Sequence, residues 1–181
     1  MPERRRILLV SGSLRDRSIN TAALRTALTV APEDVDATLY EHMADLPHFN
    51  PDDDVDPLHP AVAELRTTIR GAGAVLFSAP EYAGALPGSF KNMLDWTIGD
   101  AQTGSIYEKP VAWINPSPHG AVNAIGSLRT VLGYAHAEIV EDACVDIPIA
   151  PADLGDEGLV ADAAIRDQLA AVLATLGDHA R

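Results

Sequence analysis

The sequence is poor in cysteine and in basic side chains, and each shortage excludes a class of protein. Cys144 is the single cysteine among 181 residues, so the chain has no internal disulfide and no cluster of thiolate ligands for zinc. A reducing compartment is the simplest interpretation, and we expect the cytoplasm. Lys and Arg number 13 against 26 Asp and Glu, for a formal charge of −13. Such a charge would repel a phosphate backbone, so no nucleic-acid partner is expected.

Long apolar runs are also missing. Basic residues at the N-terminus are followed by the apolar run Ile7 to Val10, but the apolar region of a signal peptide spans roughly 7 to 15 residues. Gly, Pro or charged residues interrupt the other apolar stretches before they reach the length of a membrane span. With 47% hydrophobic and 22% charged residues, the composition indicates a soluble globular protein with no membrane partner, folded as one domain over residues 1–181.

Short apolar segments of β type alternate along the chain with longer helical segments. Strands are predicted at 6–12, 36–41, 73–79, 109–115 and 137–147, and helices at 19–30, 60–71, 87–99, 120–134 and 161–177. Three of the strands are continuous apolar runs, which is typical of a parallel sheet covered by helices on both faces. Five strands favour a flavodoxin-like α/β three-layer sandwich of order 2-1-3-4-5 over a Rossmann order. Ligands of such sheets lie beyond the carboxyl ends of the strands.

The first loop at that edge is "SGSLRDRSIN", residues 11–20. It opens a helix, so its backbone N–H groups and the positive helix end face a bound group. Ser13, Ser18 and Asn20 offer donors, and Arg15 offers a fixed positive fork suited to a phosphate dianion. The loop is not a Walker A loop and lacks the glycines of a dinucleotide fingerprint. Alternatively, Ser18 only caps the helix.

The second loop opens the stretch "SAPEYAGALPGSFKNMLDW", residues 78–96. Pro80 and Pro87 restrict the path of the chain, while Gly84 and Gly88 allow a backbone approach that a side chain would block. The loop therefore predicts a stiff, flat wall with exposed peptide groups and Tyr82 at its edge, suited to a planar heterocycle. A phosphate at the first strand and a flat ring at the third together describe FMN.

These two stretches resemble the NADPH-dependent FMN reductases of flavodoxin-like fold, which include quinone, chromate and azo-dye reductases. The hallmarks of that family have the form G-S-L-R-x-x-S-x-N and P-E-Y-x-x-x-x-P-G-x-x-K-N-x-x-D-W. The matching positions here are Gly12-Ser13-Leu14-Arg15 with Ser18 and Asn20, and Pro80-Glu81-Tyr82 with Pro87-Gly88, Lys91-Asn92 and Asp95-Trp96. The resemblance also covers the order of strands from about residue 5 to 150.

The resemblance implies FMN as cofactor, with NADPH or NADH as cosubstrate. It places the FMN phosphate on the first loop and the isoalloxazine against the second loop and a third, "NPSPHGA", residues 115–121. The cofactor-binding residues that follow are Ser13, Leu14, Arg15, Ser18, Ile19, Asn20, Pro80, Glu81, Tyr82, Ala83, Gly84 and Ser117. Prolines replace glycines in the third loop, and Ala83 stands where many relatives carry a polar residue, so the acceptor preference stays open.

Other residues receive plainer interpretations. His119 is expected to be a solvated loop histidine rather than a flavin-edge residue, and no histidine pair has helical metal spacing, so no metal site is expected. Cys144 is expected to be buried within the last strand. Residues 42–60 are expected to form a solvated acidic loop rather than a calcium site, with "LPHF" packing near the site or a partner subunit. Finally, the helix at 87–99 carries more large apolar side chains than one core-facing stripe would use, namely Phe90, Met93, Leu94 and Trp96. This excess predicts a subunit interface in a homodimer or homotetramer.

The function expected from these features is an NAD(P)H-dependent oxidoreductase whose bound FMN is the reactive group, so no side chain is assigned as catalytic. Hydride would pass to the flavin and electrons onward to a quinone, azo, metal or flavin acceptor by a ping-pong mechanism. One alternative is a flavodoxin-type electron carrier without its own turnover, against which the first two loops and the apolar helix 87–99 weigh. Another is a domain that has lost its cofactor, which a yellow preparation would exclude.

Overall fold

A parallel sheet forms the centre of the computed structural model, which describes residues 4–181. Its strands are β1 (Arg5–Ser11), β2 (Val35–Tyr40), β3 (Ala74–Ser78), β4 (Pro110–Asn115), β5 (Glu138–Ile139) and β6 (Val145–Asp146). The strands run in the order β2-β1-β3-β4-β5, with β6 also paired to β4, and every pairing is parallel. The predicted flavodoxin-like order is therefore confirmed.

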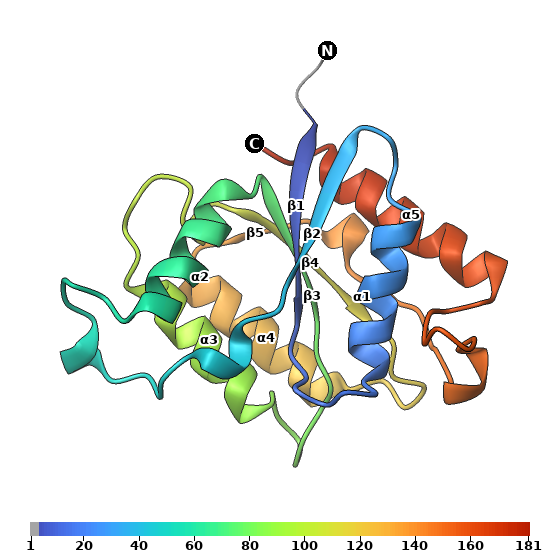
Figure 1. Ribbon diagram of the computed structural model, residues 1–181, viewed down its shortest axis with the longest axis horizontal. Helices are drawn as coiled ribbons and strands as arrows, with labels where there is room; N and C mark the ends of the chain where they lie inside the picture. Colours follow the sequence, from blue (N-terminus) through green and yellow to red (C-terminus); the bar gives the residue numbers. More distant parts are fainter. Residues whose placement is uncertain (1–3) are drawn as a thin grey trace.

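Five helices cover the two faces of the sheet (Figure 1). They are α1 (Ile19–Thr29), α2 (Pro60–Gly71), α3 (Gly88–Ile98), α4 (Val122–Tyr134) and α5 (Ala163–Gly177). Helices α1 and α5 pack on one face over one apolar core, and α2, α3 and α4 pack on the other face over a second core. Burial of all five residues of β3 and all six of β4 accounts for their unbroken apolar sequence.

The predicted last strand, 137–147, was wrong as one continuous element. It is divided into β5 and β6 by a short 3-10 turn, Glu141–Ala143. The turn buries Ala143 and leaves Glu141 exposed, where Glu141 binds Arg129 of α4. The ladder then resumes beside β4. Cys144 lies between the turn and β6 rather than in a strand, is half-buried, and donates to the carbonyl of Val140.

Residues 46–54, called the strap below, lie across the outer side of α3. Trp96 donates its indole N–H to the carbonyl of Pro47 at 2.9 Å, and its ring meets the Phe49 ring edge-on. Asp54 forms an ion pair of 2.8 Å with the buried Arg66 of α2. The prediction of a solvated acidic loop was thus wrong for Asp54, whereas the flanking acidic residues are exposed.

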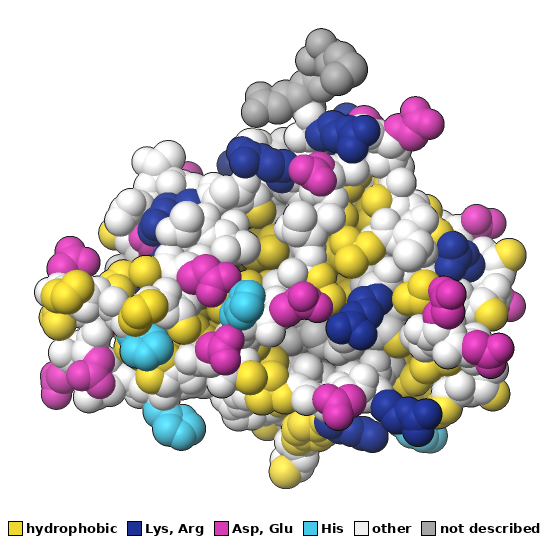
Figure 2. Space-filling view, in the orientation of Figure 1, with side chains coloured by type: hydrophobic (Ala, Val, Ile, Leu, Met, Phe, Trp, Pro, Cys, Tyr) yellow, Lys and Arg dark blue, Asp and Glu magenta, His cyan; other side chains and the backbone are white. Residues whose placement is uncertain are grey.

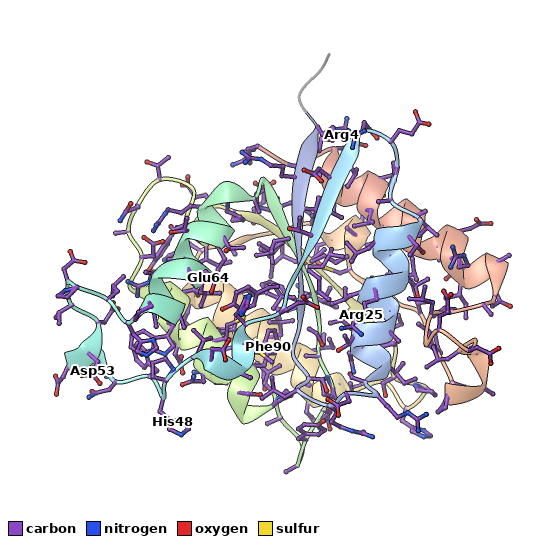
Figure 3. The ribbon with its side chains drawn as sticks, in the orientation of Figure 1. Arg4, Arg25, His48, Asp53, Glu64 and Phe90 are labelled. Carbon is purple, nitrogen blue, oxygen red and sulfur yellow. The ribbon has the colours of Figure 1, made fainter. Side chains whose placement is uncertain are left out.

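The strap also shows that the predicted subunit interface on α3 was wrong. Phe90, Met93, Leu94 and Trp96 are each at most 1% exposed within the single chain, so they cannot form a subunit interface. The sequence shows more apolar residues than one stripe needs because α3 is covered on two sides, by the sheet and by the strap. Figure 3 shows Phe90 inside the molecule, while His48 projects from the strap away from it.

The carboxyl ends of the strands lie at the lower edge in Figure 1, and the C-terminus lies at the opposite edge. The loops after β1, β3 and β4 meet at the lower edge. No helix within residues 4–181 combines the length and the apolar character needed to cross a bilayer.

Candidate functional site

The loop that follows β1, residues 11–20, turns directly into α1. Ser18 is the N-cap of this helix, and its Oγ accepts the backbone N–H of Thr21 at 3.4 Å. The capping interpretation is therefore correct, but it leaves the Ser18 hydroxyl proton free to donate to an anion. Ser13 Oγ accepts the N–H of Arg15 at 3.3 Å, which also leaves its proton free. Leu14 and Arg15 are exposed.

Asn20 lies in the first turn of α1, next to Ile19. It is buried, and its Oδ1 accepts a hydrogen bond of 2.9 Å from the hydroxyl of Ser78, the last residue of β3. Gly12 makes a second contact between the β1 and β3 loops, because a Cβ at this position would lie 2.6 Å from the Cβ of Ala79. Only glycine allows this close approach. The structure thus brings the two predicted loops together.

The β3 loop, residues 79–87, carries a tight hairpin at its tip. Tyr82 and Ala85 exchange two backbone hydrogen bonds of 3.0 Å. Ala83 and Gly84 between them have positive φ angles of 49° and 73°, as in a type I′ turn. Pro80 and Glu81 are partly exposed, and residues 82–85 are exposed, with Tyr82 at 44%. In Figure 1 this hairpin is the green tip that extends furthest at the lower edge.

Glu81 attaches this loop to the start of α4. Its Oε2 accepts the backbone N–H groups of Asn123 at 2.9 Å and Ala124 at 3.1 Å, and its Oε1 accepts the side-chain amide of Asn123 at 3.2 Å. The hydrogen bond from the Ala124 backbone, followed by that from the Asn123 side chain, lowers the pKa of the Glu81 carboxyl. The carboxylate is therefore held in its charged form by the helix end.

The β4 loop, residues 115–121, is organised by Asn115. The buried amide of Asn115 donates to the carbonyl of Gly120 at 2.6 Å and to Asp146 at 2.8 Å, while its Oδ1 accepts the N–H of Ser117. Ser117 is partly exposed, and its Oγ accepts the N–H of His119. His119 itself is exposed, as expected. The loop ends at Ala121, which has a positive φ of 41°.

Sequence reasoning missed two residues that shape the site, and it missed the partner of a third. Ser78 and Asn115 looked like ordinary strand ends. Glu81 was named as a site residue, and what the sequence did not reveal is its contact with α4. One sequence signal could have found the last of these. Ala121 occupies the N-cap of α4, where Ser, Thr, Asp or Asn is usual, so a cap from another segment was to be expected.

The charges and donors at this edge suit an anion joined to a flat ring. Basic side chains lie at the lower edge of the molecule in Figure 2, although the chain as a whole is acidic. Arg15, two free hydroxyl protons and the N-terminus of α1 form a donor set suited to a phosphate dianion. Beside it, the exposed hairpin presents peptide groups to a planar ligand. These residues fit FMN, and no group of three His, Cys, Asp or Glu within residues 4–181 is arranged to hold a metal ion.

Known proteins that are similar to this chain include FMN reductases and quinone oxidoreductases. Residues 5–152 match the family described as NADPH-dependent FMN reductase. A probable NADPH:quinone oxidoreductase of Oryza sativa subsp. japonica is 39% identical over 98 residues, which cover 52% of this chain and 48% of the relative. An NAD(P)H-dependent FMN reductase of Pseudomonas aeruginosa is 38% identical over 91 residues, or 50% of this chain and 49% of the relative. The chain thus spans about half the length of these curated relatives.

A solved structure matches over a larger share of the chain. The flavoenzyme NAD(P)H:(acceptor) oxidoreductase FerB of Paracoccus denitrificans superposes with a TM-score of 0.82 at 26% identity, over 98% of this chain and 100% of that chain.

Proposed function

Because the chain belongs to the NADPH-dependent FMN reductase family, we propose that it holds FMN at the carboxyl edge of its sheet and uses NADPH or NADH to reduce a small-molecule acceptor. One observation carries the proposal. A hydrogen bond from Ser78, at the end of β3, to Asn20, in the first turn of α1, holds the starting point of the β3 loop beside the phosphate-type donors of the β1 loop.

In this proposal the phosphate is held by the β1 loop and the isoalloxazine by the other two. Ser13, Ser18, Arg15 and the amide nitrogen of Asn20 donate to the phosphate. The ring lies against Pro80, Tyr82, Ala83 and Gly84, with Ser117 on the β4 loop. All the residues belong to one domain. When bound, FMN supplies the hydride and electron transfer, so the chain needs no catalytic acid or base.

The positions of the β3 and β4 loops also suggest the order in which the two substrates react. If the β3 and β4 loops cover one side of the ring, nicotinamide and acceptor must share the other side in turn, because reacting atoms have to approach to about 3–3.5 Å. The nicotinamide product would then leave before the acceptor enters, as in ping-pong turnover. We propose quinones, azo compounds, metal complexes and free flavins as the classes of acceptor to be assayed.

The deciding experiment uses the purified, FMN-loaded protein. Anaerobic NADPH should bleach the yellow colour without an acceptor, and a quinone added afterwards should restore it. Double-reciprocal plots at several quinone concentrations should be parallel. Bleaching only when both substrates are present would reject the shared face. A yellow protein that NADPH and NADH cannot bleach, but that a chemical reductant can, would indicate an electron carrier instead.

We also propose that copies of the chain associate as a homodimer or homotetramer through α4. The helix exposes Val122 at its first position, at 74%, and Tyr134 at its last, at 80%, and contact with a second copy would bury this apolar area. Light scattering of the eluted protein should give a mass two or four times that of one 19.2 kDa chain.

A further inference from the structure

Helix α4 begins without a cap of its own. Its N-cap is Ala121, in a left-handed conformation and without a side-chain hydrogen bond. The first backbone N–H groups of a helix lack partners within the helix, and a polar side chain at the N-cap usually binds the second or third of them. In α4 these are the groups of Asn123 and Ala124, which donate to Glu81. The cap is therefore supplied by a distant residue, 42 positions before Asn123 in the chain.

The same contacts fix the hairpin of the β3 loop. Residues 82–85 are exposed and bond to each other, so Glu81 at the base of the hairpin is what attaches it to a neighbouring element. Gly84 faces the same partner, since a Cβ built there would lie 4.0 Å from the Asn123 amide nitrogen. Three hydrogen bonds from α4 engage both oxygens of the Glu81 carboxylate, so the protein itself fixes the orientation of this side chain.

We propose that Glu81 is a positioning residue, which sets the hairpin against the β4 loop by capping α4 and does not itself bind the flavin. The inference rests on the proposed function, because it assumes that the β3 and β4 loops enclose the ring. It predicts that FMN binding and the order of the first turn of α4 are coupled. A ligand that fixes the hairpin also fixes Glu81, and through Glu81 it protects the N–H groups of Asn123 and Ala124 from exchange.

The test compares Glu81→Ala and Glu81→Gln with a matched control, Glu141→Ala. Glu141 also binds α4 from another segment, through a 2.9 Å hydrogen bond to Arg129, but it lies outside the site. Two quantities are measured for each protein: FMN affinity, by fluorescence titration of the apoprotein, and amide hydrogen exchange at Asn123 and Ala124 with and without FMN. Glu81→Gln keeps a carbonyl oxygen that can still accept from α4, so it separates capping from charge.

Glu81→Ala should weaken FMN binding tenfold or more, speed exchange at Asn123 and Ala124 in the apoprotein, and abolish the protection that FMN adds there. Glu81→Gln should fall between wild type and Glu81→Ala in both measurements, and Glu141→Ala should stay within twofold of wild type in affinity. Unchanged affinity in Glu81→Ala, or lost affinity with normal exchange, would overturn the inference. If the wild type bound no FMN, the proposed function would fail. Amide exchange in the apoprotein would still show whether Glu81 caps α4.

Discussion

The hydroxyl of Ser78 donates a hydrogen bond of 2.9 Å to Oδ1 of Asn20, and this contact joins the end of β3 to the first turn of α1. Both residues are buried. Because the oxygen of the Asn20 side chain is already bonded to Ser78, the amide nitrogen is the part of this side chain that remains for a ligand. The contact therefore fixes which way the amide faces in the proposed phosphate site.

Replacing Asn20 by Asp tests this orientation. The introduced carboxylate keeps one oxygen that can accept from Ser78, but it puts a second, charged oxygen where the amide nitrogen stood. A donor to the phosphate is lost and a like charge is gained, so FMN should bind about 100-fold more weakly, which corresponds to about 2.7 kcal/mol. Titration of the apoprotein with FMN measures the change.

Riboflavin, which lacks the phosphate, is the control for Asn20→Asp. Its affinity should change less than threefold, because the ring-facing loops are untouched. An equal loss for both ligands would place Asn20 at the ring or in the folding of the loop, and not at a phosphate.

Gly84→Leu should remove FMN binding while the fold persists. The reason is conformational rather than steric. Space around a Cβ at this position is open, but φ is +73°, where side-chain-bearing residues cost roughly 1–2 kcal/mol. The hairpin should relax to another turn and lose its flat face. Flavin content at 450 nm and the thermal midpoint should be measured together, with Gly88→Ala, at an open position without a positive φ, as the control. Full flavin content in Gly84→Leu would show that the hairpin is not the wall.

Most of the fold followed from the period of apolar residues. β3 and β4 are buried throughout, and a strand covered on both faces has an unbroken apolar sequence that is easily recognised. The last strand did not follow, because Glu141–Ala143 leaves the ladder to bury Ala143 and to bring Glu141 to Arg129. This break in the strand depends on a contact with Arg129, 12 positions earlier in the chain, which the apolar pattern does not show.

The features of the site that depend on local backbone conformation or on a short sequence motif could be predicted. Ser18 caps α1 and Gly84 adopts a positive φ, both as their residue types suggest. The tertiary partners were not predictable. Asn92 and Trp96 belong to the family motif but bind the strap, and Glu81 binds α4. A single sequence does not show which polar residues meet across more than 40 positions.

Asn92→Ala should destabilise the protein by releasing the strap. The Oδ1 of Asn92 accepts the N–H of Phe49 at 2.7 Å, and its amide donates to the carbonyl of Pro47 at 2.9 Å. The N–H of Phe49 would lose its partner and the carbonyl of Pro47 would keep only the indole of Trp96, at a cost of about 1–3 kcal/mol in the free energy of unfolding. Urea denaturation measures this loss. Lys91→Ala removes only an exposed pair with Asp95 and should cost less than about 0.5 kcal/mol. Equal costs would mean that the strap does not depend on Asn92.

Lys109 should make stability depend on pH in the alkaline range. The residue is 6% exposed, and its ammonium donates to the carbonyls of Ile69 and Ala72 at the end of α2. Burial, and secondarily the charge of Arg6, lowers the pKa of Lys109 from 10.5 to about 8. Between these two values the unfolded chain binds a proton that the folded chain has released. The free energy of unfolding should therefore rise with pH from about 8 to 10.5, by up to an amount on the order of 3 kcal/mol.

Lys109→Met isolates this contribution, because every other titrating group, including the Cys144 thiol, is common to both proteins. Methionine fills the same space without a charge and leaves the two α2 carbonyls without their donor. The difference in unfolding free energy between wild type and Lys109→Met, from urea denaturation at a series of pH values, should shift toward the wild type as the pH rises above about 8. A difference that stays constant up to pH 10.5 would mean that Lys109 remains charged in the fold, held by the two carbonyls more strongly than burial opposes it.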